Sequence, residues 1–247
     1  MVERHDRATL ATFYSEAPLT TGELRVEGTA AQHARVLRLA SGSAVRLADG
    51  RGRVGGGELL SIGKSAMSVR VDHVAEVPRP TTLEAIVPVA DRDRMLIAAE
   101  KCVELQVTAW RPAICARSRS VVPRGEGAKF RDKVAARMRG ALEQSGSAWL
   151  PDTYEELDLG EALAAVPEAA RRLLLDSTGE PLAGLVWNGP TAFAVGPEGG
   201  FEDAEVKAAL QAGWMTASLG TTTLRFETAV IASAAVLRAA QLSTRSE

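Results

Sequence analysis

The stretch TAFAVGPEGGFEDAEVKAALQAGWMTASLGTTTLRFETA, from residue 191 to residue 229, decides the fold class. It opens with an apolar run of strand length at 191–195, followed by a glycine-rich turn and a helical pattern over 202–212. The order then repeats, with a second apolar run at 214–219, a second glycine-bearing loop and a helical pattern over 226–241. Such alternation is typical of an α/β domain with a largely parallel sheet.

The same alternation extends toward the amino terminus as far as residue 83. Further strands are predicted at 83–90, 109–114 and 172–176, and further helices at 91–106, 127–145 and 158–171, the last with a proline break. Residues 10–78 differ, because short strands separated by Gly and Ser surround one helix at about 30–39. These strands are predicted at 12–15, 23–27, 44–49, 53–62 and 66–77. This pattern suggests a small β-barrel, and Pro78–Arg79–Pro80 is the best linker candidate, which gives domains 1–78 and 79–247.

The composition is that of an ordinary globular chain. Its 247 residues are 46% hydrophobic and 24% charged, and they contain no apolar run of about 18 residues that would span a membrane. The amino-terminal sequence MVERHDRATL lacks the apolar core of a signal peptide, so we expect a cytoplasmic protein. Cys102 and Cys115 are expected to be buried thiols rather than a disulfide, and the three scattered histidines give no metal-site signature.

Positive charge gathers in residues 111–139. Nine basic and two acidic side chains there give this segment a net charge of +7, against −2 for the whole chain. A basic stripe on an acidic protein suggests a polyanionic partner such as nucleic acid, although a solvated helix face would produce the same pattern.

Two loops are candidates for binding a ligand. The first, VGPEGGF at 195–201, places three glycines at the end of a strand, which leaves backbone amides free and lets a ligand approach the main chain. Its spacing matches neither the dinucleotide fingerprint nor the phosphate-binding loop, and a tight turn without a ligand remains an alternative. The second, LGTTTLRFETA at 219–229, also joins a strand to a helix. Here Glu227 suits the helix dipole, and Arg225 is either a surface charge or a substrate clamp.

Together these two motifs resemble the RsmE family of 16S rRNA uridine N3-methyltransferases, which belongs to the SPOUT superfamily. The resemblance covers about residues 12 to 240, and five other segments agree with it in place and order. They are HARVLRL (33–39), DGRG (49–52), DRDRMLIAAEKCVELQV (91–107), ARS (116–118) and ALEQSG (141–146). The sequence departs from the family at Thr12, Gln106 and Phe226, where arginine, glycine and a smaller residue are usual.

The resemblance implies a fold, a reaction and partners that periodicity does not show. Residues 1–78 would form a PUA-like RNA-binding β-barrel, and residues 79–247 a SPOUT α/β domain with a deep trefoil knot over about 170–240. The protein would be a homodimer that uses S-adenosylmethionine, without a metal, to methylate ring nitrogen 3 of a uridine in 16S rRNA of the 30S subunit. The target base would leave its stack to reach the methyl donor.

The resemblance also implies roles for particular residues. The cofactor would be held by Leu174, Val195, Gly196, Pro197, Glu198, Gly199, Gly200, Leu219, Gly220 and Leu224. Arg225 is the candidate cation that stabilises the deprotonated uracil, and Glu198 is either the base or a brace of the loop. RNA phosphates would be contacted by Arg35, Arg38, Arg92, Arg94, Arg117, Arg119 and Arg124.

Three other functions remain open. A ribose 2′-O RNA methyltransferase of the same superfamily is the nearest alternative, and the PUA-like domain together with both loop motifs favours base methylation. A non-catalytic RNA-binding protein would leave the glycine-rich loop unexplained. A nicotinamide-dependent oxidoreductase would need a GxGxxG fingerprint, which the sequence lacks.

Overall fold

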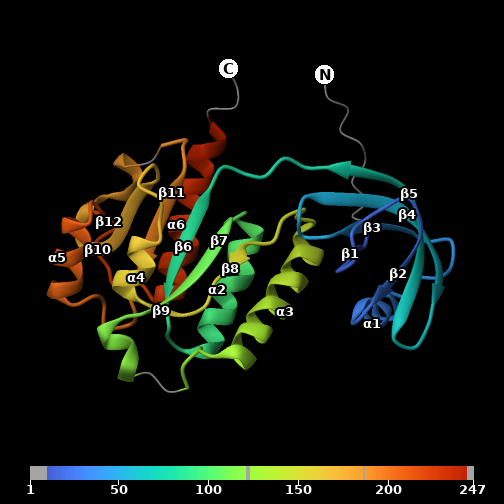
Figure 1. Ribbon diagram of the computed structural model, residues 1–247, viewed down its shortest axis with the longest axis horizontal. Coiled ribbons are helices and arrows are strands. Elements are labelled where there is room, and N and C mark those ends of the chain that lie inside the picture. Colours follow the sequence, from blue (N-terminus) through green and yellow to red (C-terminus); the bar gives the residue numbers. More distant parts are fainter. Residues whose placement is uncertain (1–9, 121–122, 186, 244–247) are drawn as a thin grey trace. The chain divides into compact units, whose positions relative to one another are not determined.

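The computed structural model describes residues 10–120, 123–185 and 187–243, apart from the side chains of residues 119 and 120 (Figure 1). The chain forms two compact units. The first contains the residues up to Arg79 together with Arg139–Leu150, and the second contains Pro80–Met138 and the residues from Pro151 onward. Sequence analysis placed the boundary at 78/79 but did not assign the segment after residue 138 to the first unit.

The first unit is built on one five-stranded sheet. Its strand order is β1-β3-β4-β5-β2, and every pair is antiparallel except β1 with β3. The strands are β1 (Thr12–Tyr14), β2 (Gly22–Glu27), β3 (Ala44–Ala48), β4 (Arg53–Ile62) and β5 (Ala66–Glu76), and the helix is α1 (Ala30–Val36). Phe13, Leu47 and Leu59 are fully buried in the core that α1 closes.

Three consecutive glycines let β4 and β5 approach each other closely. A Cβ atom on Gly57 would lie 2.0 Å from the Arg70 carbonyl oxygen, and one on Gly56 would lie 2.3 Å from the imidazole of His73. The pairing register also shifts between Gly56 and Gly57. The run Gly55–Gly57 therefore forms a bulge that no larger residue fits.

The second unit contains a seven-stranded sheet in which every described pair is parallel. The order is β12-β10-β11-β6-β7-β8, with β9 also paired to β7. The strands are β6 (Leu83–Pro88), β7 (Ala109–Ile114), β8 (Asp152–Thr153), β9 (Leu157–Asp158), β10 (Arg171–Pro181), β11 (Thr191–Val195) and β12 (Met215–Ser218). The helices are α2 (Arg92–Glu104), η1 (Ala116–Ser120), α4 (Leu159–Ala164), η2 (Leu182–Gly184), α5 (Asp203–Gln211), α6 (Phe226–Ser243) and the part of α3 (Ala128–Ser145) up to Met138, the rest of α3 belonging to the first unit. The predicted strand–helix alternation is confirmed.

Helices cover both faces of this sheet (Figure 1). Helices α4 and α5 share one core with Ile86, Leu174 and Ala194. Helix α6 contacts β6, β11 and α2. Since successive side chains of a strand point to opposite faces, Phe193 and Leu175 lie on the other face of the sheet from Leu174. The sheet is therefore the central layer of the unit.

The structure corrects two boundaries. The helix predicted at 158–171 ends at Ala164, because Pro167 has no N–H to continue it. The strand predicted at 172–176 instead runs from Arg171 to Pro181. The second half of this strand is polar and lacks the alternation of apolar and polar side chains that predicts a strand. It forms a strand because it pairs with β12 after a register shift.

Both cysteines are free and buried, as predicted. Burial raises the pKa of the Cys115 thiol to about 12 and raises the pKa of Cys102 as well. No helix in the described part of the chain is long and apolar enough to cross a membrane. Within the same ranges, no group of three or more His, Cys, Asp or Glu side chains could hold a metal ion.

One arginine of the basic segment lies inside the sheet. Arg111 on β7 donates from Nε to Glu84 on β6 at 2.6 Å, and the two side chains are 8% and 7% exposed. The guanidinium carbon of Arg111 also lies 3.9 Å from the ring centre of Tyr154. Arg111 is therefore a core residue and is removed from the surface charge of this segment.

We predict that Arg111→Met destabilises the protein by about 3–5 kcal/mol, because Glu84 is left as a buried charge without its partner. The double variant Arg111→Met/Glu84→Leu should recover most of this loss, since an apolar pair can replace a buried ion pair. Urea unfolding of the two variants and the parent measures both changes. A single variant within about 1 kcal/mol of the parent would contradict the prediction.

Candidate functional site

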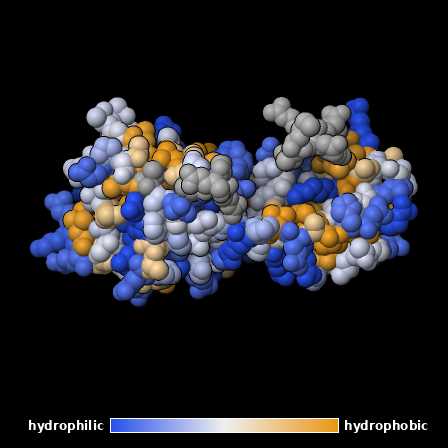
Figure 2. Space-filling model, turned by 90° about the horizontal axis from the view of Figure 1, so that it is seen from above, coloured by the Kyte–Doolittle hydropathy of each residue, from blue (hydrophilic) through white to orange (hydrophobic). Residues whose placement is uncertain are grey.

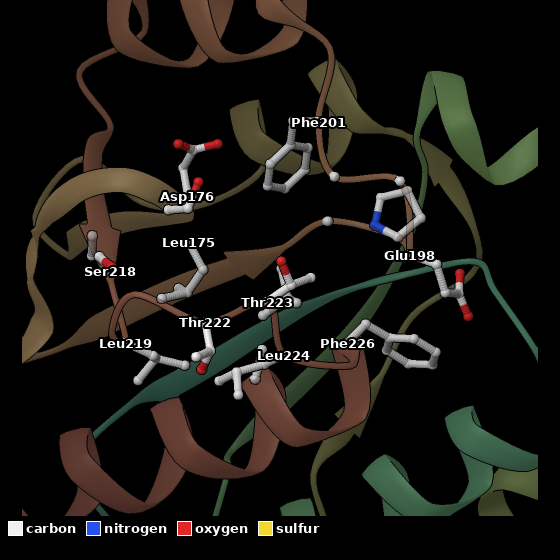
Figure 3. A pocket seen from close by; sticks show the side chains of 18 of the residues that line it. Leu175, Asp176, Glu198, Phe201, Ser218, Leu219, Thr222, Thr223, Leu224 and Phe226 are labelled. Carbon is white, nitrogen blue, oxygen red and sulfur yellow. The ribbon is translucent and has the colours of Figure 1, made fainter.

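A pocket of about 400 Å³ lies at the carboxyl ends of β11 and β12 and beside the register shift in the middle of β10 (Figure 3). This volume is within the range of small-molecule sites, and this edge of a parallel sheet is where ligands bind in α/β folds. The irregular middle of β10, the loops after β11 and β12, and the start of α6 line it. The lining residues are Leu175–Ser177, Val195–Phe201, Ala217–Gly220, Thr222–Leu224, Phe226 and Ala229.

The loop after β11 has a conformation that needs glycine. Gly200 has a φ of +71°, in the left-handed region. A Cβ on Gly196 would lie 3.1 Å from both the carbonyl carbon of Gly200 and the amide nitrogen of Phe201. The Gly200 amide closes the turn onto the Pro197 carbonyl at 2.8 Å. The loop is thus a compact turn whose main chain forms one wall of the pocket.

Neighbouring elements hold this loop in place. Arg117 on η1 donates a hydrogen bond to the carbonyl oxygen of Gly199. Glu205 on α5 accepts from the amides of Ala116 at 2.8 Å and of Glu202 at 2.8 Å. The second of these contacts belongs to a capping box that begins α5. Helix α5 therefore fixes both the loop and η1.

The other two loops are stabilised by their own side chains. Asp176, after the first half of β10, accepts from the amide of Thr178 at 2.8 Å and from its hydroxyl at 2.6 Å. Ser218, at the end of β12, donates to the Gly220 carbonyl at 3.0 Å and accepts from the Gly220 amide at 3.2 Å. The positions of these loops do not depend on contacts with a ligand.

Arg94 links two parts of the site. Its Nη1 lies 3.4 Å from Glu198 Oε1 in the β11 loop, and its Nε lies 4.0 Å from Glu227 Oε1 in the first turn of α6. In Figure 3, Glu198 and Phe226 lie at the end of the pocket away from Asp176 and Ser218. Arg94 therefore joins the pocket-lining Glu198 to the first turn of α6 without itself lining the pocket.

The pocket brings together nine of the ten residues predicted to bind a cofactor. They are Val195, Gly196, Pro197, Glu198, Gly199, Gly200, Leu219, Gly220 and Leu224. Leu174 does not line the pocket, because its side chain points into the core shared with α4 and α5, and its neighbour Leu175 lines the pocket instead. The lining residues that the sequence did not single out are Ser177, Ala217, Ser218 and Ala229, for which proximity to predicted residues was the only signal.

Most of the predicted RNA-contacting arginines bind their own chain. Arg35 donates to the carbonyls of Gly63 at 2.7 Å and Lys64 at 3.2 Å. Arg124 pairs with Glu126 at 2.7 Å. Like Arg94 and Arg117, these two side chains have structural partners, so an RNA role for them competes with an intramolecular one.

The remaining predicted residues differ in their surroundings. The guanidinium of Arg92 lies 5.3 Å from the ring centre of Phe130. Arg38, just after α1, and Arg225, between two pocket-lining residues, are both exposed. Arg225 itself is not among the lining residues. The side chain of Arg119 lies outside the described residues.

Comparison with known proteins identifies the family. The RNA methyltransferase domain family matches residues 77–238, and the RNA methyltransferase PUA domain family matches residues 26–72. The chain therefore belongs to the RNA methyltransferase family, with a PUA-like domain before the methyltransferase domain. Both the predicted resemblance and the predicted PUA-like unit are confirmed.

Two relatives carry the name ribosomal RNA small subunit methyltransferase E. The one from Synechocystis is 31% identical over 204 residues, which are 79% of this chain and 65% of that relative, slightly less than two thirds of its length. The one from Mycobacterium tuberculosis is 29% identical over 240 residues, covering 88% and 87% of the two chains.

Two solved structures are similar over nearly the whole chain. Ribosomal RNA small subunit methyltransferase E from Neisseria gonorrhoeae, bound to S-adenosyl methionine, has a TM-score of 0.84 at 28% identity and covers 93% of this chain and 97% of its own. A methyltransferase from Legionella pneumophila in complex with the cofactor SAM has a TM-score of 0.81 at 26% identity, with coverages of 94% and 98%.

We predict that Gly200→Ala destabilises the protein by about 1–2 kcal/mol, because alanine is strained at a φ of +71°. Its added methyl group would meet nothing closer than 3.9 Å, so the cost is that of the backbone alone. The matched control is Gly160→Ala on α4, which has open space and helical geometry and should gain about 0.4–1 kcal/mol. Urea unfolding tests whether the two changes have opposite signs.

Proposed function

We propose that this protein uses S-adenosylmethionine to methylate ring nitrogen 3 of a uridine in 16S ribosomal RNA. The observation that carries the proposal is the pocket formed by the middle of β10 and the loops after β11 and β12, together with its glycine-rich wall. The two similar structures bound to S-adenosylmethionine and the two relatives named small subunit methyltransferase E support it.

The charge of the pocket fits this cofactor. The described residues that line it include two carboxylates, Asp176 and Glu198, and no Lys, Arg or His. Such a lining suits a ligand with a positively charged sulfur and disfavours the pyrophosphate of a dinucleotide. The exposed main chain around Gly196–Gly200 and Leu219–Leu224 offers amides and carbonyls to the adenosyl group. When bound, S-adenosylmethionine supplies an electrophilic methyl group.

The acceptor nitrogen must lose its proton to become a nucleophile. We propose that Arg225 stabilises the negative charge that then develops on the uracil, because it is an exposed cation beside Leu224 and Phe226 of the pocket. Glu198 was predicted as a base or a brace. Its ion pair with Arg94 favours the role of brace for the β11 loop.

The remaining parts of the proposal concern binding and assembly. We propose that residues 1–78 and the basic segment bind rRNA in the 30S subunit, with Arg38 and Arg92 among the phosphate contacts. Phosphate contacts position the RNA, and the flipped base enters the methyltransferase domain formed by residues 79–247. A cytoplasmic location follows from this substrate.

We also propose a homodimer and a knotted carboxyl-terminal segment. Val236 and Leu242 on α6 are 37% and 49% exposed, and Figure 2 shows apolar surface on the second unit around the end of this helix. A second subunit would cover such apolar side chains. Helix α6 packs on β6, β11 and η2, which is compatible with a chain threaded through the segment between β10 and β11.

The first experiment is a methyl-transfer assay with labelled S-adenosylmethionine. The substrates are 30S subunits from a strain that lacks the modification and naked 16S RNA, and the products are identified by nucleoside mass spectrometry. We expect label in 3-methyluridine, with the 30S subunit as the better substrate. Label in a 2′-O-methylated nucleoside would identify the alternative reaction, and cofactor binding without transfer would reject the substrate.

We predict that Arg225→Ala lowers the methylation rate by about 100- to 1000-fold, because a cation that stabilises the transition state is lost. Lys207→Ala removes an exposed cation from α5 of the same unit and is the matched control, with an expected rate within about twofold of the parent. Single-turnover rates at saturating cofactor provide the measurement. An unchanged rate for Arg225→Ala would reject this role.

A further inference from the structure

Two adjacent apolar side chains stand uncovered at the end of helix α1. Val36 is 72% exposed and Leu37 is 45% exposed, and Val36 is the most exposed large hydrophobic residue in the described part of the chain. The buried face of the helix consists of Ala30, Ala31 and Ala34, so the core of the first unit uses neither side chain. Packing within the protein therefore does not explain this pair.

The residue after the pair has a backbone conformation that favours glycine. Arg38 has a φ of +56°, in the left-handed region. Its amide donates to the carbonyl of Arg35 at 3.0 Å, and the amide of Leu39 donates to the carbonyl of Ala34 at 3.0 Å, which is the pattern of a Schellman motif. Glycine is usual at this position, because a residue with a Cβ atom is strained there. An arginine that is kept in this conformation points to a use for its guanidinium.

Hydrogen bonds fix the position of the helix end. Arg35 donates to the carbonyls of Gly63 at 2.7 Å and Lys64 at 3.2 Å, which joins α1 to the turn between β4 and β5. At the middle of the helix, His33 Nδ1 lies 3.1 Å from Glu143 Oε2. Figure 1 shows α1 close to β2, with which it is in contact. The apolar pair is therefore presented by a helix end that is anchored to its own unit.

The charged groups near the pair are cations. The side chains of Arg38 and Lys64 are exposed and make no hydrogen bond or ion pair with another residue that the structure describes. Glu27, the acidic residue that most closely precedes α1, is paired with Arg25 at 3.2 Å. Unpaired cations near an apolar pair complement a ligand that has both anionic groups and apolar faces. Single-stranded RNA has both, since its phosphates link bases whose faces are uncovered.

We propose that the α1 tip, defined as Val36, Leu37 and Arg38, contacts unpaired nucleotides of the substrate rRNA, an assignment that rests on the proposed function. The two apolar side chains pack against the faces of bases that lie outside a duplex, and Arg38 and Lys64 bind the adjoining phosphates. Apolar side chains have a similar role in proteins that unstack a base step. Duplex RNA does not fit, because its stacked bases present no face. The α1 tip thus selects a loop or junction of the RNA.

The first test removes the apolar pair. Val36→Ser/Leu37→Ser should weaken binding to 30S subunits that lack the modification by about 10- to 100-fold, because two apolar contacts are lost. The control is Leu210→Ser on α5, which removes a side chain that is 48% exposed and should change the affinity by less than about twofold. Binding of S-adenosylmethionine should be unchanged in both. An unchanged affinity of the double variant for the subunit overturns the proposal.

A second variant separates a loss of binding from a loss of folding. Arg38→Gly relieves the strain at a φ of +56°, so its midpoint of urea unfolding should lie above that of the parent. It should nevertheless bind the subunit more weakly and reduce the slope of log affinity against log salt concentration by about one. The serine double variant should keep the slope of the parent, since it removes no charge. An unchanged affinity and slope in Arg38→Gly overturns the role of this cation.

Photo-crosslinking identifies the molecule that the α1 tip touches. A diazirine amino acid is placed at position 37, or at position 210 as the control, and the complex with the 30S subunit is irradiated. We expect a covalent product with an unpaired segment of 16S rRNA from position 37 alone. A product with a ribosomal protein, or no excess over the control, overturns the proposal. The proposed function is decided separately, because the nucleoside that the parent enzyme methylates is identified without these variants.

Discussion

The order β12-β10-β11 in a parallel sheet is the constraint on which the site depends. Because these strands are parallel neighbours, the register shift of β10 and the loops after β11 and β12 meet at one edge although they are about 20 residues apart in sequence. The glycine-rich turn after β11 supplies a compact wall, and the self-bonded loops at Asp176 and Ser218 supply the others. Each wall is held by hydrogen bonds within the protein.

The chain uses much of its positive charge internally. Arg111 is buried against Glu84, Arg117 holds the Gly199 carbonyl, and Arg94 connects Glu198 with Glu227. A count of charges along the sequence cannot separate such residues from those that face a polyanion, because the difference lies in what each guanidinium reaches after folding. The electrostatic attraction of the basic segment for RNA is therefore smaller than its net charge of +7 implies.

The site combines two electrostatic environments. The part that would hold the cofactor is lined by main chain, apolar groups and the carboxylate of Asp176, which suits a positively charged ligand. At the other end a guanidinium and two carboxylates converge, and one carboxylate oxygen lacks a partner.

The sequence by itself determined the class of fold, most strand and helix positions, the PUA-like unit, the family and nine lining residues of the pocket, because periodicity and glycine-bearing motifs are local. Tertiary structure alone decided that Leu175 rather than Leu174 faces the pocket, that β10 continues to Pro181 and that Arg139–Leu150 joins the first unit. It also decided the partners of Arg94. Strand register, burial and ion pairing depend on residues distant in sequence, and no local pattern records which of them meet.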